Sequence, residues 1–274
     1  MRFPAILAVA VLLCGGLAAS ECSPATTKPS SKPTTTTASS EPLDPAVVKI
    51  LRDQEYAADK YATIRADVDF KVVDRRIGDS ETRTGWVVYQ KGRQGEKAKF
   101  RAHFDTLRQG EGANRKEVVD WAFDGYWLSK AQPRIKQILR LQIVAEGQKS
   151  EPMRLGKGPL PLPFGQKADE VLAYYDASTR PVATDEPKGT TYLKLNVKKA
   201  HYAEMDSVRL EIWVDPRTQL PVKLVSRDKK KKVTTVTFSN VKTNIKIDPR
   251  KMFELPLPAM WTEDKRPLKK AASD

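Results

Sequence analysis

The residues best suited to chemistry are few in this chain and are widely separated. The chain has two histidines, His103 and His201, and neither lies near a second histidine or a carboxylate cluster at metal-binding spacing. Asp67 and Asp69 are a candidate acid–base pair. They alternate with basic residues on the polar side of a strand pattern, which favours a solvated ladder of charges. We therefore expect no catalytic residues, no metal site and no cofactor.

Two further features are weak candidates for chemistry. The segment GKGPLPLPFG, residues 156–165, superficially resembles a phosphate loop, but it lacks the spacing of the nucleotide-binding fingerprints and is followed by prolines rather than a helix. It is expected to be a connection or lid. The only cysteines are Cys14 and Cys22, so the region after them has no disulfide, thiolate ligand or cysteine nucleophile. Neither cysteine is preceded by the small residues that lipid modification requires.

The N-terminal segment has the pattern of a secretion signal. Residues 1–20 combine Arg2, an apolar run from Ala5 to Leu17 and a small-residue cleavage site. The apolar run is shorter than the roughly 20 residues of a spanning helix. Residues 21–43 are rich in Ser, Thr and Pro, which predicts a disordered linker. The sequence predicts an exported, periplasmic protein, and an uncleaved N-terminal anchor is the alternative.

The charge is strongly basic. Lys and Arg number 48 against 34 Asp and Glu, a formal net charge of +14. This balance suits an anionic partner such as lipid headgroups or nucleic acid. The basic residues are spread along the chain and accompany no nucleic-acid-binding motif, so no nucleic-acid partner is expected. The dense run Lys229–Lys232 lies between two strand patterns and is expected to be a solvated hairpin tip.

Periodicity predicts one helix, then strands, then a short helix and more strands. Asp44 and Pro45 form a helix start, and the helix should end near Tyr61. Alternation predicts strands at 64–72, 85–90, 98–104, 119–123, 126–130 and 135–145, and again at 191–197, 208–214, 221–227 and 233–240. A short helix is expected at 167–175. The folded domain should span 44–261, with a charged tail at 262–274.

Short turns between successive strands favour an antiparallel sheet with one apolar side, covered by the two helices. Ten large apolar residues on the strand faces are candidates for a concave, ligand-binding cavity: Val68, Phe70, Phe100, Phe104, Trp121, Phe123, Leu139, Leu141, Ile212 and Phe238. An ordinary filled core would give the same alternation, so both interpretations stay open.

Several motifs carry a family resemblance. The stretch Ile212–Trp261 contains W-x-D-P-x-T-x-L-P-V-K, T-F-S-N-V-K and F-x-L-P-x-P, and residues 123–128 read FDGYWL. In these motifs the chain resembles the outer-membrane lipoprotein carrier family (LolA-like). The resemblance covers most of residues 44–261 and is most specific in the C-terminal third.

The resemblance implies a mainly β fold with few helices. This fold is an unclosed, half β-barrel of antiparallel strands, with an N-terminal helix and a short mid-chain helix covering its concave face. The implied partners are acylated lipoproteins or other lipids, an inner-membrane transporter and an outer-membrane receptor, with transient membrane contact. Candidate lid residues are Leu160, Leu162, Phe164, Val171 and Leu172.

One position departs from the family pattern. Lys91 stands where the family has the arginine that holds the lid closed, and lysine lacks the planar fork of arginine. Lys91 is therefore a candidate latch of a different kind.

Two functional hypotheses follow, neither of them enzymatic. The first is a periplasmic carrier or chaperone that binds the acyl chains of lipoproteins in a hydrophobic cavity for transfer toward the outer membrane. The second is a tethered lipid-binding sensor or scaffold with the same fold, which the linker and the missing arginine favour. An envelope hydrolase is a third class, for which no nucleophile–base pair is visible.

Overall fold

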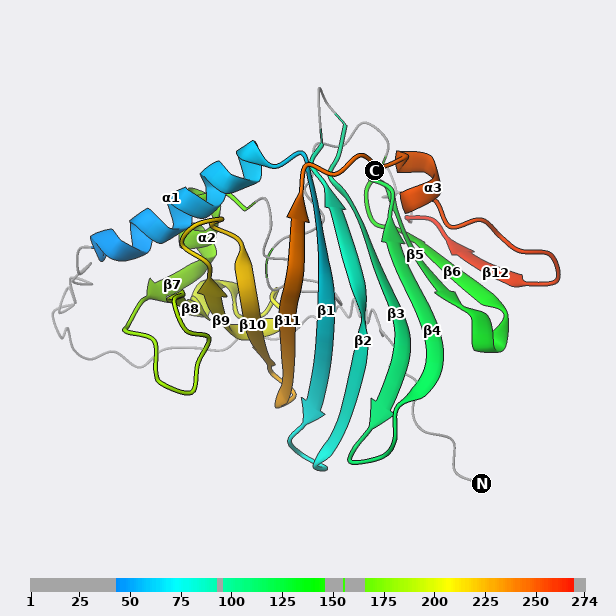
Figure 1. Cartoon of the computed structure of the whole chain (residues 1–274), viewed down its shortest axis with the longest axis horizontal. Helices are drawn as coiled ribbons and strands as arrows, with labels where there is room; N and C mark the ends of the chain where they lie inside the picture. Colours follow the sequence, from blue (N-terminus) through cyan, green and yellow to red (C-terminus); the bar gives the residue numbers. More distant parts are fainter. Residues whose placement is uncertain (1–42, 93–95, 146–154, 156–165, 269–274) are drawn as a thin grey trace, which may run out of the picture. The chain divides into compact units, whose positions relative to one another are not determined.

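A single twelve-stranded sheet forms most of the fold. The computed structural model describes residues 43–92, 96–145, 155 and 166–268, and these fall in one compact unit. The sheet is unclosed and twists strongly, so that the strands at either end run at a slant to the central ones (Figure 1). The expected fold class, mainly β with few helices and an open sheet, is confirmed.

The helices and strands follow one another in a simple order. In chain order, the first elements are α1 (Pro45–Lys60), β1 (Thr63–Asp74), β2 (Asp79–Gln90), β3 (Lys99–Gln109), β4 (Arg115–Phe123), β5 (Trp127–Gln132), β6 (Gln137–Gln142) and α2 (Ala168–Tyr174). The remaining elements are β7 (Tyr175–Ser178), β8 (Thr191–Val197), β9 (Ser207–Val214), β10 (Pro221–Asp228), β11 (Lys232–Thr243), α3 (Pro249–Phe253) and β12 (Thr262–Arg266). Short 3-10 turns lie at Pro133–Ile135 and Lys199–His201.

The first helix forms for the local reasons that its sequence indicates. The Asp44 side chain accepts a hydrogen bond from the Ala46 N–H at 2.8 Å, and Pro45 occupies the first helical position. Val47, Leu51 and Ala57 recur at helical spacing and are buried. The expected helix is confirmed. None of the described helices is long and apolar enough to cross a membrane.

The order of strands across the sheet is β12-β6-β5-β4-β3-β2-β1-β11-β10-β9-β8-β7. Ten of the eleven neighbouring pairs are antiparallel, as expected, and β12 is parallel to β6. β11 pairs with β1, which joins the N-terminal and C-terminal halves of the strand series into one sheet.

Two strands were not anticipated from the sequence. Residues 262–266, expected to belong to a charged tail, form the edge strand β12, and Tyr175–Ser178 form the opposite edge strand β7. The sequence TEDKR has no apolar alternation. Its pairing comes from backbone hydrogen bonding to β6, supported by the ion pair between Arg140 and Glu263 at 2.5 Å. Charged edge strands of this kind resist further strand addition.

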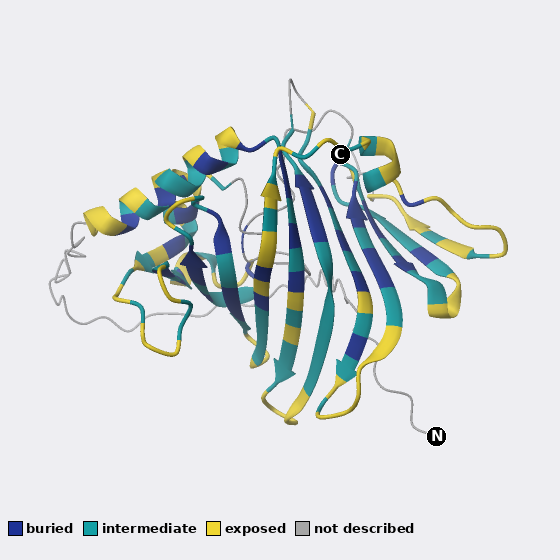
Figure 2. Cartoon of the chain, in the orientation of Figure 1, coloured by how far each residue is buried: buried dark blue, intermediate teal, exposed yellow. Residues whose placement is uncertain are grey.

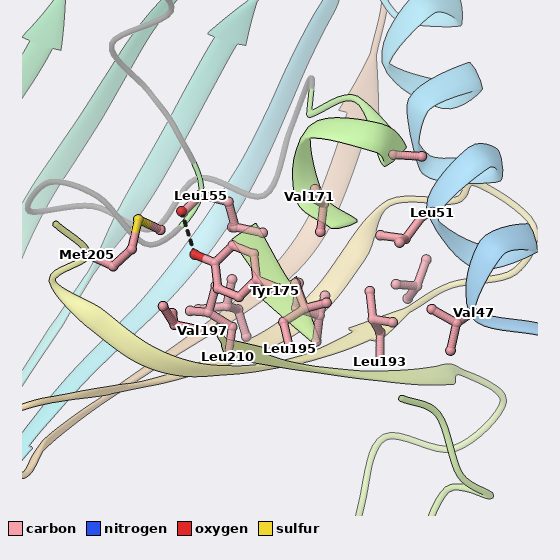
Figure 3. Packing of buried hydrophobic residues seen from close by; sticks show 14 residues of the cluster. Val47, Leu51, Leu155, Val171, Tyr175, Leu193, Leu195, Val197, Met205 and Leu210 are labelled. Carbon is pink, nitrogen blue, oxygen red and sulfur yellow. Dashed lines mark hydrogen bonds between the residues drawn. The ribbon is translucent and has the colours of Figure 1, made fainter. Parts of the chain in front are cut away.

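The sheet has two distinct faces. We call inner the face that carries Ile64, Ala66 and Val68 of β1, and outer the face that carries Arg65 and Asp67. Ala57, near the end of α1, packs on the inner face with β1–β3 and β11. At the β7–β10 end of the same face, Val47 and Leu51 of α1 and Val171 of α2 form one cluster with β8, β9 and β10. Figure 3 shows this cluster, in which the Tyr175 hydroxyl donates to the Leu155 carbonyl at 2.7 Å.

The outer face is covered in part by the C-terminal segment. α3 contacts β3, and the Arg101 guanidinium donates to the Met252 carbonyl at 3.3 Å. Leu255 and the half-buried Trp261 pack with Ile138 in a second, smaller cluster. Along β1–β4, buried residues gather at the ends near α1, and exposed or half-buried residues at the ends that lead to turns 75–78 and 110–114 (Figure 2).

Candidate ligand-binding face

All ten candidate cavity residues lie on the inner face. The cross-strand register places Phe238 opposite Val68, Phe123 opposite Phe100, and Leu141 opposite Leu128. The same register continues from Phe70 through Val236 and Leu224 to Ile212. The period-two alternation therefore assigned these side chains to a common face, because residues paired across antiparallel strands point to the same side.

The ten residues differ in burial. Val68, Phe100, Phe104, Phe123, Ile212 and Phe238 are buried. Phe70, Trp121, Leu139 and Leu141 are half-buried. The buried rings pack against neighbours on the same face, with ring centroids 6.0 Å apart for Phe100 and Phe123 and 5.6 Å apart for Phe104 and Phe70. The half-buried group is the part of this set that presents apolar surface.

The end of the inner face beneath the helices is filled by the chain itself. Ile212 lies there, and the cavity between α1, α2 and the sheet has a volume of about 20 Å³. This space holds about one water molecule. By contrast, the cluster of Phe100, Phe123, Leu128 and Val144, at the β3–β6 side, includes no helical residue.

A charged group shares the inner face with these apolar side chains. Arg83 contacts Glu81 at 2.5 Å and Glu117 at 3.2 Å, and Glu117 also contacts the exposed Arg115 at 3.2 Å. Arg83 lies opposite Phe70 and Leu107 in the register, which places it on the inner face. Burial raises the pKa of Glu117, but its ion pairs with the two arginines outweigh burial and hold this pKa below the usual range.

Lys130 is a further cation of the inner face. It lies opposite Trp121 and Leu139, and its ammonium sits 4.8 Å from the centroid of the Trp121 ring. Burial lowers the pKa of Lys130 and the positive charge of Arg83 adds to this effect, while the Glu81 carboxylate opposes it without cancelling it. The inner face therefore combines apolar surface with partly desolvated positive charge.

Sequence reasoning missed this charged group for a definite reason. The strand expected at 85–90 begins at Asp79 in the structure, so Glu81 and Arg83 lay outside the expected element. Glu81 and Arg83 stand two and four positions before Gly85 and Val87 in a period-two series, and this spacing could have assigned them to the inner face. Lys130 was inside an expected strand, but only apolar residues were considered as cavity lining.

The candidate lid is only partly described by the structure. Leu160, Leu162 and Phe164 lie outside the described residues. Val171 of α2 is buried in the helix-covered cluster, and Leu172 packs against it. The helix is attached at both ends: its Ala168 N–H donates to Glu55 of α1 at 3.2 Å, and Lys198 donates to the Leu172 carbonyl at 2.6 Å.

The candidate latch residue joins β2 to α1. The Lys91 ammonium forms an ion pair with Asp59 of α1, and its backbone N–H donates to the Ala62 carbonyl at 3.0 Å. Both side chains of the ion pair are accessible to solvent, so the pair contributes little to stability. In this structure Lys91 contacts the N-terminal helix rather than α2.

Both histidines are half-buried. His103 lies on the outer face, stacked on Trp86 with ring centroids 5.2 Å apart and 3.0 Å from an Asp120 oxygen. His201 contacts Glu204 at 2.6 Å. The Trp86 ring covers part of His103, and the Tyr174 ring of α2 covers part of His201, with centroids 4.3 Å apart. The local sequence reveals neither contact. Across the described ranges, no group of three His, Cys, Asp or Glu side chains is placed to hold a metal ion.

The comparisons with known proteins give distant likenesses only. No family model matches the chain, and no curated protein matches it in sequence. Among solved structures, an uncharacterized conserved protein from Thermus thermophilus is similar over 81% of this chain and 99% of its own, with 13% identity and a TM-score of 0.46.

Two mycobacterial structures are similar at the same level. LprF from Mycobacterium bovis has 12% identity and a TM-score of 0.41 over 75% of this chain and 97% of its own. The lipoprotein LppX from Mycobacterium tuberculosis has 11% identity and a TM-score of 0.40 over 75% of this chain and 100% of its own. At these identities and TM-scores, the likenesses assign no function to this chain.

Proposed function

We propose that this protein is a non-enzymatic carrier that binds the acyl chains of lipid-like ligands on the inner face of its open sheet. The observation that carries the proposal is the half-buried group Phe70, Trp121, Leu139 and Leu141, which lies on the same face as the packed rings. Phe70 and Trp121 pack against the cluster that includes Ala57 of α1, and none of the four belongs to the cluster beneath α1 and α2. An exposed apolar surface of this kind is costly in water and is typical of a ligand-binding face.

The energetics suit such a ligand. Each buried CH₂ group of an acyl chain contributes about 0.8 kcal/mol, so four of them give roughly 3 kcal/mol, or a factor of roughly 200 in affinity. A chain that is only partly inserted therefore binds usefully and can still be released. The proposed ligands are acylated lipoproteins or other lipids, and the proposed setting is the periplasm, reached through the signal at residues 1–20.

Transfer toward the outer membrane is the finer part of the proposal. It rests on the sequence resemblance to the lipoprotein carrier family and includes an inner-membrane transporter and an outer-membrane receptor as partners. A tethered sensor or scaffold is the second candidate, favoured by the Ser/Thr/Pro linker and by Lys91 in place of the family arginine. Identification of what co-purifies from the native envelope separates the two: lipoproteins support the carrier, and a signalling protein supports the sensor.

Binding of a fluorescent fatty-acyl probe tests the central claim. Purified protein should take up the probe, and Leu141→Glu should abolish uptake while lowering the melting temperature only slightly, because Leu141 is already half-exposed. Val73→Glu is the matched control, since Val73 is a half-buried aliphatic residue on the outer face. Probe uptake should survive in that variant.

Phe104→Glu gives a second, contrasting variant. Phe104 is 2% exposed, so a carboxylate there should destabilise the whole domain rather than remove binding alone. If the wild-type protein takes up no acyl probe, or if Leu141→Glu binds it as well as the wild type does, the inner face is an ordinary core and the carrier function is wrong.

A further inference from the structure

Lys130 is placed unusually for a lysine. Its ammonium is partly desolvated on the inner face, and in the part of the chain that the structure describes it has no carboxylate partner within ion-pair distance. Its ammonium lies over the ring face of Trp121, and the Glu81 carboxylate attracts it from beyond ion-pair distance. Burying a charge without an opposite charge is costly, so a lysine in this position is more stable when an anion joins it.

Arg83 gives independent evidence that an anion would be stabilised on this face. One of its terminal nitrogens, Nη1, is buried and lacks a hydrogen-bond partner among the described residues, although Nε and Nη2 contact Glu81 and Glu117. The side chain as a whole is 15% exposed. An unsatisfied buried donor costs about 1–3 kcal/mol, and an acceptor brought by a ligand would remove that cost.

The local charges leave an excess of positive charge. Arg83, Arg115 and Lys130 face two carboxylates, Glu81 and Glu117, and these carboxylates already accept from the arginines. Most of the guanidinium nitrogens thus have a carboxylate partner within the protein. The ammonium of Lys130 lacks an ion-pair partner, and Nη1 of Arg83 lacks a hydrogen-bond partner, among the described residues. A fully satisfied structural network would not leave both of these cationic groups on one face.

We infer that Lys130 and Arg83 form a subsite for the acidic headgroup of the ligand, a carboxylate or phosphate, while its apolar chain lies along the neighbouring apolar side chains. The cross-strand register places the two cations beside the apolar side chains, as a ligand with a charged head and an apolar chain requires. Lys130 is flanked across the strands by Trp121 and Leu139, and Arg83 by Phe70. Three of the four half-buried candidate residues are therefore direct neighbours of the two cations. This inference rests on the proposed function and adds the chemical class of the ligand.

The chemistry of the two cations fits an oxyanion. The guanidinium group donates directional hydrogen bonds to carboxylate and phosphate oxygens, and the ammonium supplies a compact positive charge. Because both groups are partly withdrawn from water, their attraction to an anion is screened by salt less than at the protein surface. A neutral lipid of the same length should bind more weakly, since it would leave both cations without a partner.

A pair of matched probes tests the subsite. The fluorescent fatty acid cis-parinaric acid and its methyl ester have the same chain and differ only in the charge of the head. The wild-type protein should bind the acid about tenfold more tightly than the ester, a difference of about 1.4 kcal/mol. Lys130→Met should remove most of this preference and leave the affinity for the ester within about twofold, because methionine preserves an apolar contact with Trp121.

Two controls make the result specific. Lys71→Met removes an exposed lysine from the outer face of the same sheet and should keep the tenfold preference. The melting temperature of Lys130→Met should equal or exceed that of the wild type, since the change relieves a desolvated charge. A Lys130→Met protein that unfolds would instead assign Lys130 a structural role, and Arg83→Gln would then provide the test of acid preference.

The outcomes separate the subsite from the carrier function. If the acid and the ester bind equally well to the wild type, the subsite is wrong while the carrier function stands. If neither probe binds, the proposed function fails and the subsite fails with it. Inorganic phosphate identifies the source of the anion: displacement of the acid, but not of the ester, only at millimolar phosphate would support a headgroup subsite, whereas phosphate that binds as tightly as the acid would mean that the site serves a free anion and would contradict a headgroup role.

Discussion

Gly85 shows how a single residue sets the geometry of the inner face. A Cβ atom built at this position would lie 1.9 Å from the His103 carbonyl oxygen, because the register between β2 and β3 shifts between Thr84 and Gly85. Gly85 lies opposite Val68 and Phe104, so the close approach of the backbones is what lets those two side chains meet over it.

Gly85→Ala should therefore force the two strands apart. We expect a loss of about 1–3 kcal/mol in the free energy of unfolding, the usual cost of overpacking. Chemical denaturation of the variant measures this loss. Thr82→Ala, at a half-buried outer-face position of the same strand, should change the stability by no more than about 0.5 kcal/mol. A Gly85→Ala protein as stable as the wild type would show that the bulge can relax.

Glu186 is a residue whose charge contributes to stability. Its hydrogen bonds with the Arg180 guanidinium, at 2.5 and 2.8 Å, hold its pKa at about 2, well below the ordinary value of 4.5. A carboxylate with a depressed pKa in the folded state stabilises the fold above its unfolded pKa. That contribution is lost as the pH falls from about 4.5 toward about 2.

The lowered pKa of Glu186 in the folded state predicts how the stability depends on pH. The wild type should be more stable than Glu186→Gln at pH 7, and the difference should shrink as the pH is lowered from 5 to 2. Urea unfolding of both proteins across this range measures it. Glu111→Gln, in the exposed turn between β3 and β4, should show no such convergence. A constant difference between wild type and Glu186→Gln at all pH values would contradict the role of the ion pair.

At the scale of whole elements, the edge strand β12 is the clearest departure from the local sequence pattern. It is joined to β6 by parallel pairing, and the Thr262 N–H donates to the Lys136 carbonyl at 2.9 Å. Arg140 contacts Glu263 and also donates to the Leu255 carbonyl at 2.7 Å, which ties the returning C-terminal segment to the sheet. β12 therefore belongs structurally to the folded sheet.

Truncation of the chain tests the contribution of β12. A protein ending at residue 261 should have a lower melting temperature than the full chain, because β6 loses its ladder partner and Arg140 loses Glu263. A protein ending at residue 268 keeps β12 and should melt like the full chain. Equal melting temperatures for the two truncated proteins would mean that residues 262–268 act as a tail.

At the scale of the whole molecule, the remaining prediction concerns the boundary between the N-terminal linker and the folded unit. The composition of residues 21–43 predicts a linker, and the helix cap at Asp44 begins the folded unit. Limited proteolysis should therefore remove residues up to about Glu41 and leave a resistant core beginning near Asp44. Mass spectrometry of the core defines this boundary. A core that unfolds once the linker is cut would place part of the linker in the domain.

The sequence by itself determined the helices α1 and α2, most strands and the side of the sheet to which the apolar strand residues belong, but not the short helix α3. These properties depend on local periodicity and on capping residues such as Asp44, which act within a few positions along the chain. For the same reason, the ten candidate cavity residues were correctly assigned to one face, from Val68 in the first strand to Phe238 in the last long one.

Only the tertiary structure decided which parts of that face are filled. Ile212 and Leu141 follow the same alternation, yet one lies beneath two helices and the other is half-exposed, because burial depends on elements far away in the sequence. The same is true of β12, which forms by pairing with a strand 125 positions earlier, and of Lys130, whose desolvation comes from its cross-strand neighbours. Long-range contacts of this kind leave no periodic signal in the local sequence.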